Sequence, residues 1–331
     1  MRPALLSAAS FVGLIAFAFM ATSASAATIA VDTDYPAKPI RVIVGFPPGG
    51  GNDEIARIVG PKLAEKSGRA VVIDNRPGAG GNLAADLTAK APADGYTILV
   101  ISSSHPIQGL LKKNLPYDPV KDFAGVAQLV VYRSLLVTFP GVPANSPAEL
   151  IALAKAKPGQ INFVSSGNGS ASHLAGELFK VSAQLNITHV PYKGSSPALI
   201  DLIAGRVQMM FSPLVPVLPH IKANRLRALA VTSLARSRLL PELPTINEAG
   251  VAGFEFVSWY AIVAPGATPP TVIGKLNALL NQVMRLPEIT ERLQGEDMDV
   301  VRKTPQEFDA VRAAMLVKWS KIIRQTGIQA D

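Results

Sequence analysis

Short apolar runs that alternate with helical patterns constrain the fold of this chain more than any other feature. Three of them, IRVIVGF (40–46), AVVIDN (70–75) and YTILVIS (96–102), are continuously apolar, as is typical of strands buried on both faces of a parallel sheet. Helical periodicity fills the intervals, with apolar positions from Ile55 to Leu63 on one helical face. This strand–helix–strand order, with right-handed crossovers, predicts an open α/β sheet.

A second α/β unit follows. Four more strands are expected, at INFVSS (161–166), ITHVPY (187–192), VQMMFSP (207–213) and LRALAVT (226–232). A capping box at 146–149 and another at 304–307 predict helix starts. Two long apolar stripes predict buried helix faces, one in the second unit and one in the last helix. They consist of Leu174, Leu178, Val181 and Leu185, and of Phe308, Val311, Met315, Trp319 and Ile322.

The two units are expected to be joined by two passages of chain. VVYRSLLVTFP (130–140) and FEFVSWYAIVAP (254–265) are strand-like and lie at the transitions. Two crossings create a hinge and leave a cleft between domains. Ligands of open α/β sheets bind beyond the carboxyl ends of the strands. The predicted boundaries are 28–136 with 256–331 for domain I, and 137–255 for domain II.

The N-terminus predicts export. Arg2 precedes a long apolar stretch, and Ala24-Ser25-Ala26 forms a small-residue cleavage site, so residues 1–26 are interpreted as a cleaved signal peptide and the mature chain as periplasmic. A retained membrane anchor is the alternative. The chain has no cysteine, which excludes disulfides and sulfur-ligated metal sites.

The charge pattern argues against nucleic acid as a partner. The formal net charge is +8, but the basic residues are scattered, whereas nucleic-acid binding needs a basic stripe or patch. Anionic small molecules fit such a surface better.

Two Gly/Ser-rich loops stand at the same topological point, between a strand end and a helix start. One runs from Phe46 to Asp53 and the other from Ser165 to Ser170. The first turn of a helix has unpaired N–H groups and a partial positive charge, so such loops favour a carboxylate or phosphate. Each loop could also be a plain turn. The candidate ligand-binding residues in them are Phe46, Pro48, Gly49, Gly50, Gly51, Asn52, Asp53, Ser165, Ser166, Gly167, Gly169 and Ser170.

The sequence lacks the motifs of nucleotide-binding, metal-binding and serine-hydrolase sites. The loops spell neither a P-loop nor the dinucleotide fingerprint, so no nucleotide cofactor is expected. The four histidines have no metal spacing, so no metal is expected. A serine hydrolase stays possible because serines are plentiful, but no G-x-S-x-G elbow is present.

Further cleft candidates have two or more interpretations. Asp53 caps its own helix or meets a ligand. His173 bonds to loop backbone, contacts ligand or, least favoured, takes part in catalysis. Lys193 borders the cleft or is solvated. Core packing is the default for at least one of Trp259 and Tyr260. Tyr192 and Gly194 end a strand of the second unit and are expected to border the cleft. The remaining candidates for side chains that line the cleft are Ser104, His105, Phe211 and Tyr260.

Several segments together resemble a known family. They are YPAKPIRVIVGFPPGGGNDEIAR, VVIDNRPGAGGNLAAD, LPYDPVKDFAGVAQL, VSSGNGSASHLAGELFK, THVPYKGSSPALIDLIAG and LPTINEAGVAGFE. Over nearly all of the mature chain they are similar to the Bug-type receptors, the extracytoplasmic solute-binding proteins of tripartite tricarboxylate transporters.

The resemblance implies a two-domain, Venus-flytrap fold of the periplasmic binding protein class, and no enzymatic activity. It implies binding of a small carboxylate (a di- or tricarboxylate, an acidic amino acid or an aromatic acid) and delivery to membrane components of the transporter by a monomer. Some relatives serve sensing instead. The two ligand-gripping loops of the family match 46–53 and 165–170. Asn52 stands where the family often has Thr or Ser, so this position offers an amide in place of a hydroxyl.

Overall fold

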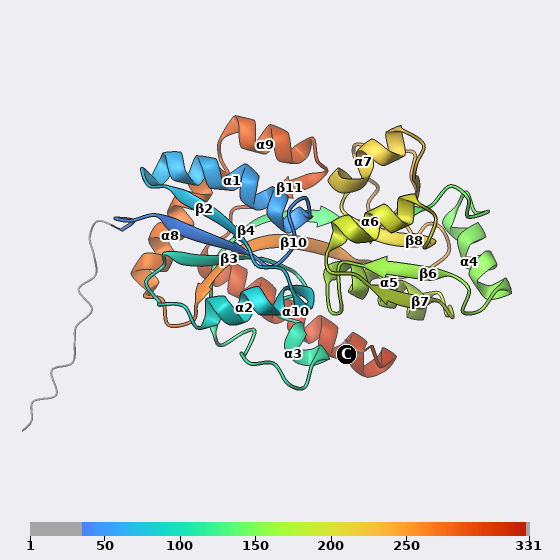
Figure 1. Ribbon diagram of the computed structural model, residues 1–331, viewed down its shortest axis with the longest axis horizontal. Coiled ribbons are helices and arrows are strands. Elements are labelled where there is room, and N and C mark those ends of the chain that lie inside the picture. Colours follow the sequence, from blue (N-terminus) through green and yellow to red (C-terminus); the bar gives the residue numbers. More distant parts are fainter. Residues whose placement is uncertain (1–34, 329–331) are drawn as a thin grey trace, which may run out of the picture. The chain divides into compact units, whose positions relative to one another are not determined.

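The computed structural model describes residues 35–328. The predicted signal peptide, residues 1–26, lies outside the described residues. Most of the elements are labelled in Figure 1.

The first sheet has six strands in the order β11-β4-β10-β3-β1-β2. Its predicted parallel part is confirmed, because β1 pairs with β2 on one side and β3 on the other in parallel register. Strands β10, β4 and β11 extend it in antiparallel fashion. The six strands are β1 Ile40–Val44, β2 Val71–Asn75, β3 Thr97–Ser102, β4 Phe123–Arg133, β10 Val257–Pro265 and β11 Met298–Val300.

The second sheet has five strands in the order β7-β6-β8-β5-β9. Strand β6 pairs in parallel with β7 and β8, while β5 runs antiparallel to β8 and β9. Its strands are β5 Leu135–Thr138, β6 Asn162–Ser165, β7 Thr188–Pro191, β8 Met209–Ser212 and β9 Arg227–Val231.

Helices cover both faces of each sheet, which is why most positions of the inner strands are apolar. In β1, Val42 and Val44 join the core beneath α1, α8 and α9, whereas Ile43 joins the core beneath α2 and the start of α10. The second sheet packs against α4 and α5 on one face and α6 and α7 on the other. The helices are α1 Gly51–Ser67, α2 Asn82–Ala89, α3 Gln108–Leu111, α4 Pro147–Ala156, α5 Ala171–Ser182, α6 Ser195–Ile203, α7 Leu214–Lys222, α8 Pro270–Val283, α9 Pro287–Gln294 and α10 Pro305–Thr326, with a 3₁₀ turn η1 at Ala79–Gly81.

The chain leaves the first sheet at Ser134, which lies between β4 and β5. It returns with β10, which pairs along its length with β4. Both passages coincide with the two strand-like segments expected to cross between domains. The exact domain boundaries stay a prediction.

Helix α10 connects the two cores. Its predicted apolar stripe is confirmed, with Phe308 buried in the core of the first sheet and Trp319 buried in the core of the second. Met315 packs against both cores. The last helix therefore belongs to both halves, although its residues were assigned to domain I.

Local signals had mixed outcomes. The capping box of α10 is complete, whereas at α4 only Ser146 caps and the Glu149 carboxylate accepts instead from the Asn145 N–H. The stripe in α5 was partly wrong, because Val181 is exposed and Phe179 takes the core position. No helix between residues 35 and 328 combines the length and the apolar character that crossing a bilayer demands.

Candidate functional site

The first Gly-rich loop connects the carboxyl end of strand β1 to the start of α1. Gly50 is the N-cap and offers no side chain, so the first N–H groups of α1 lack a side-chain partner. A Cβ at Gly51 would overlap the Tyr260 hydroxyl. Only glycine allows this close approach of the helix start to β10.

Asp53 holds the loop rather than facing the space beyond it. Its buried carboxylate accepts from the Gly49 N–H at 3.0 Å, Arg57 Nε at 2.9 Å and Asn75 Nδ2 at 2.8 Å. Burial by itself would raise the pKa of this carboxyl, but the hydrogen bonds from Arg57, Asn75 and Gly49 outweigh it and lower the pKa. This contact set matches the interpretation of Asp53 as a residue that organises its own helix start.

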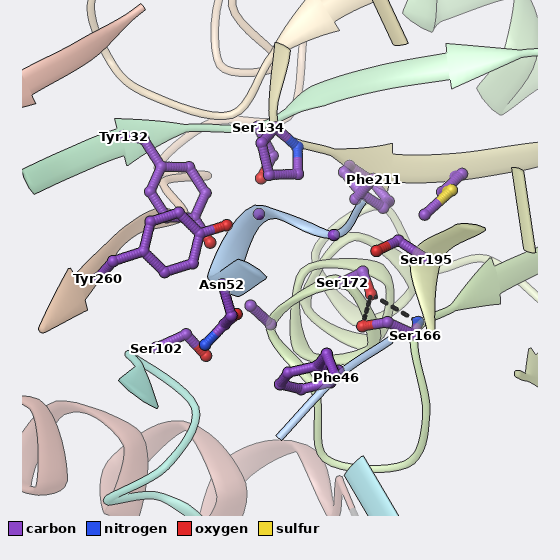
Figure 2. A pocket seen from close by; sticks show the side chains of 15 residues that line it. Phe46, Asn52, Ser102, Tyr132, Ser134, Ser166, Ser172, Ser195, Phe211 and Tyr260 are labelled. Atoms are coloured by element: carbon purple, nitrogen blue, oxygen red, sulfur yellow. Dashed lines mark hydrogen bonds between the residues drawn. The ribbon is translucent and has the colours of Figure 1, made fainter. Parts of the chain in front are cut away.

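The second loop ends at the start of α5, and here the N-cap has a side chain. Ser170 is the N-cap, and its hydroxyl accepts from the His173 N–H at 3.3 Å. The Ser172 hydroxyl accepts from the Ser166 N–H at 3.0 Å and lies 3.2 Å from Ser166 Oγ; both contacts are drawn as dashed lines in Figure 2. Ser166 and Ser172 thus form a hydroxyl pair at the helix start.

Two further helix starts, those of α6 and α7, face the same space as the starts of α1 and α5. The N-cap of α6 is Gly194, which has no capping side chain, and the N-cap of α7 is Pro213. Ser195 is the first residue of α6. Sequence reasoning had anticipated two such starts, one in each half.

These four helix starts surround a cavity of about 40 Å³, shown in Figure 2. It lies beyond the carboxyl ends of β3 and β8, as expected for open α/β sheets. None of its lining residues is Lys, Arg or His. The lining consists of Phe46, Gly50, Gly51, Asn52, Ser102, Tyr132, Ser134, Ser166, Ala171, Ser172, Ser195, Met210, Phe211, Pro213 and Tyr260.

Two stacked tyrosines form one wall of the cavity. The ring centroids of Tyr132 and Tyr260 are 4.5 Å apart, with an interplanar angle of 22°. Burial raises the pKa of both phenols, so both hydroxyls stay protonated at neutral pH and can donate. Neutral hydroxyl donors next to helix N-termini favour an anion without the presence of a cationic side chain.

Two neighbouring cavities share the Phe46 ring with the central one. The first is lined by Ser104 and His105 among others. Burial, and secondarily the Arg312 charge, lower the pKa of His105 to about 3, so its ring is neutral. The second is lined by Ser166, Gly167, Tyr192 and Lys193 among others, and has a volume of about 350 Å³.

The structure therefore brings together part of the predicted set. Seven of its members line the central cavity, namely Phe46, Gly50, Gly51, Asn52, Ser166, Phe211 and Tyr260. Five lie on the neighbouring cavities without reaching the central one, namely Ser104, His105, Gly167, Tyr192 and Lys193. The others line none of the three, namely Pro48, Gly49, Asp53, Ser165, Gly169, Ser170, His173 and Gly194. For these last residues a ligand contact stays a prediction.

His173 bonds to loop backbone. Its Nδ1 accepts from the Gly169 N–H at 3.0 Å, and its ring stacks on His189 with centroids 4.0 Å apart. Burial, with smaller contributions from two lysines, lowers the pKa of His173 to about 4. The neutral ring thus maintains the shape of the second loop.

The two halves touch on either side of the central cavity. On one side Gln108 Nε2 donates to the Gly169 carbonyl at 2.7 Å, and a Cβ at Gly80 would overlap the Asn168 carbonyl. On the other side Ser196 Oγ donates to the Pro48 carbonyl at 3.2 Å. These contacts between the segments of the first and second sheets describe a closed arrangement around the cavity.

Sequence reasoning missed eight lining residues. They are Ser102, Tyr132, Ser134, Ala171, Ser172, Ser195, Met210 and Pro213. The first turn of α6 could have been found, because Gly194-Ser195 repeats the strand–Gly/Ser–helix order of the two loops. Tyr132 and Ser134 gave no local signal, because their place depends on how β4 passes into β5.

Within residues 35–328, no three His, Cys, Asp or Glu side chains gather closely enough to hold a metal ion.

Comparison with known proteins points in one direction. The family profile described as "Tripartite tricarboxylate transporter family receptor" matches residues 55–328. Protein BugT of Bordetella pertussis is 39% identical over 311 residues, covering 93% of this chain and 95% of BugT.

Two solved structures are similar in fold and carry ligands. Rpa4515 of R. palustris with adipate has a TM-score of 0.86 at 36% identity, covering 89% of this chain and 99% of the other. MatC from Rhodopseudomonas palustris with bound malate has a TM-score of 0.84 at 29% identity, covering 87% of this chain and 100% of the other.

Proposed function

Because the chain belongs to the tripartite tricarboxylate transporter receptor family, we propose that it is a periplasmic receptor that captures a small carboxylate and delivers it to the membrane components of such a transporter. The single observation that carries the proposal is the cavity on which the N-termini of α1, α5, α6 and α7 converge without a lysine, arginine or histidine in its lining. We further propose that the chain acts as a monomer, without enzymatic activity.

The carboxylate binds to main-chain N–H groups of the first helical turns. Gly51 and Asn52 contribute from α1, Ala171 and Ser172 from α5, and Ser195 from α6. A helix start carries roughly half a positive elementary charge, so about two such starts balance one carboxylate, and the converging helix starts more than suffice. Neutral tyrosine hydroxyls beside the start of α1 donate as well, with water filling the gaps.

The energy of this arrangement suffices for capture. Hydrogen bonds to a charged group contribute about 1.5–3 kcal/mol each. Micromolar affinity corresponds to about 8.2 kcal/mol, which equals about three to five such bonds. The ligands named for Rpa4515 and MatC, adipate and malate, are both carboxylic acids, which supports an acid as the ligand of this chain.

Delivery depends on closure. The contacts of Ser196 with the Pro48 carbonyl and of Gln108 with the Gly169 carbonyl join the two halves only when the cleft is shut. A membrane partner that recognises the closed form would distinguish loaded from empty receptor. A membrane sensor could read the same closed form, so uptake and sensing share this site.

The experiment is a calorimetric titration of the purified mature chain with mono-, di- and tricarboxylates, acidic amino acids and aromatic acids, with amines and sugars as controls. We expect at least one acid to bind with micromolar affinity. Binding of an amine or a sugar, with silence from every acid, would contradict the proposal.

A secreted serine hydrolase is the alternative, and one contact favours it. Ser165 Oγ lies 2.6 Å from His189 Nε2. However, the Ser165 side chain is fully buried, and burial, with smaller contributions from His173 and Lys180, lowers the pKa of His189 to about 3. A general base is most effective with a pKa near the working pH. Absence of labelling by a fluorophosphonate probe, together with absence of ester hydrolysis, would exclude this alternative.

A further inference from the structure

The central cavity is too small for a whole ligand. A volume of about 40 Å³ holds roughly three water molecules on a scale of about 10–15 Å³ per water. One carboxylate group fills this space. The rest of any longer acid must therefore extend into a neighbouring space.

The larger neighbouring cavity, which we call the outer cavity, provides that space. It is lined by 45–47, 78–80, 112, 166–168 and 191–193, and its volume is about 350 Å³. Phe46 and Ser166 line both the central and the outer cavity, so the two adjoin at these side chains. Figure 2 shows Phe46 and Ser166 at the lower side of the central cavity.

The outer cavity has the charge that the central one lacks. Lys112 and Lys193 both line it, and no Asp or Glu does. Within the described part of the chain, neither amine forms an ion pair with a carboxylate. Burial lowers the pKa of Lys112. An anion close to this amine would offset that effect by favouring its charged form.

The two lysines come from different halves of the molecule. Lys112 follows α3 in the segment between β3 and β4 of the first sheet, and Lys193 follows β7 of the second. Closing the cleft brings these like charges to one cavity, which costs free energy unless an anion lies between them. A second acid group at this place would link closure to the charge of the ligand.

We propose that Lys112 and Lys193 form an outer anion subsite that binds the second acid group of an extended diacid, whose first carboxylate occupies the central cavity. This inference rests on the proposed function of carboxylate capture. It names the class of ligand as a diacid long enough to pass Phe46, in contrast to a monoacid or a short diacid.

The test compares matched acids in the same calorimetric assay. Linear α,ω-dicarboxylates of increasing length are each paired with the monocarboxylate of equal carbon number, and the affinity ratio of the two is the diacid gain. For the wild-type chain we expect no gain at short lengths and a gain above a threshold length. The gain should shrink with added salt, because the outer cavity is open to solvent.

Variants assign the gain to the two amines. Lys112→Gln and Lys193→Gln should each reduce the gain by about two- to fivefold, the range of partly exposed ion pairs. Because the gain is a ratio of diacid to monoacid affinity, any effect common to both acids cancels. Lys113→Gln is the matched control, because Lys113 is the neighbouring exposed lysine and lines none of the three cavities. A gain that persists in the double variant, or equal binding of diacids and monoacids at every length, overturns the inference.

The remaining outcomes are also decisive. Sulfate that binds in a lysine-dependent manner, without any diacid gain, would assign the pair to free anions and overturn the diacid subsite. If monoacids bind and the lysine variants do not change the diacid gain, this inference is removed and the proposed function stays intact. Silence from every acid would remove both.

Discussion

Replacement of Gly80 by alanine tests whether the closed arrangement supports binding. Gly80 lies in η1 with φ +68°, and an added Cβ would overlap the Asn168 carbonyl from the opposite half. Two costs follow. A left-handed conformation costs a non-glycine residue about 1–2 kcal/mol. Overpacking costs about 1–3 kcal/mol, and it acts only when the halves are closed.

Gly68 separates these two costs. It has φ +65° at the end of α1, and an added Cβ would meet nothing within 4 Å. Gly68→Ala therefore carries the conformational cost alone. Both variants should lose about 1–2 kcal/mol of unfolding free energy. Only Gly80→Ala should also bind acid more weakly, by about 5- to 150-fold, the equivalent of 1–3 kcal/mol.

Denaturant titration measures the first effect and calorimetry the second. Wild-type acid affinity in Gly80→Ala would refute the reasoning, because the contact with Asn168 would then be unimportant for the bound form. Equal loss of affinity in both variants would refute it too, since the loss would then come from backbone strain.

Three further predictions concern α1. Gly51→Ala should abolish acid binding and lose about 1–3 kcal/mol of stability, because the added Cβ overlaps Tyr260. Its control is Gly274→Ala inside α8, where a Cβ meets nothing within 4 Å and stability should rise by about 0.5–1 kcal/mol. Equal thermal denaturation curves of the two variants would contradict this prediction. Asp53→Asn should lower the free energy of unfolding by about 1–3 kcal/mol, because the Arg57 and Asn75 donors then face an amide in place of a carboxylate. Because the pKa of Asp53 is lowered in the folded state, its contribution to the free energy of unfolding is lost as pH falls below the ordinary range of aspartate. The Asp53→Asn variant should not show this loss of stability at low pH. Burial, followed by a neighbouring glutamate charge, raises the pKa of Glu54 to about 7, so the native state binds the extra proton and stability should fall as pH rises from about 4.5 through 7. Glu54→Gln should remove that fall in denaturant titrations across this pH range, and an unchanged pH profile would contradict the assignment.

Local patterns were sufficient for much of the fold. Continuous apolar runs predicted the three parallel strands of the first sheet, because a strand covered on two faces needs no polar side chain. The strand–Gly/Ser–helix order located the starts of α1 and α5. Where two apolar faces compete, the pattern was insufficient, as at Val181 and Phe179 in α5, because the position of the neighbouring β8 and of Phe254 decides which side is covered.

The site was predictable only in part, for the same reason. Gly50, Gly51 and Ser166 stand next to helix starts, and this is a property of a few consecutive residues. The roles of Tyr132 and Ser134 depend on β4 pairing with β10 and on the chain leaving the sheet at Ser134. Asp53 and His173 lie at the helix starts that follow these loops, yet both stabilise the loops. Asp53 does so through Arg57 and Asn75, and His173 through Gly169.

By itself, the order of residues determined two α/β units and a glycine-rich helix start in each, because strand burial and helix initiation are set by near neighbours in the chain. Only the tertiary structure decided that four helix starts share one small cavity, that two tyrosines line it, and that Lys112 and Lys193 line one neighbouring cavity. Contacts between distant segments depend on sheet register and on closure of the two halves, and neither is encoded in a short stretch of sequence.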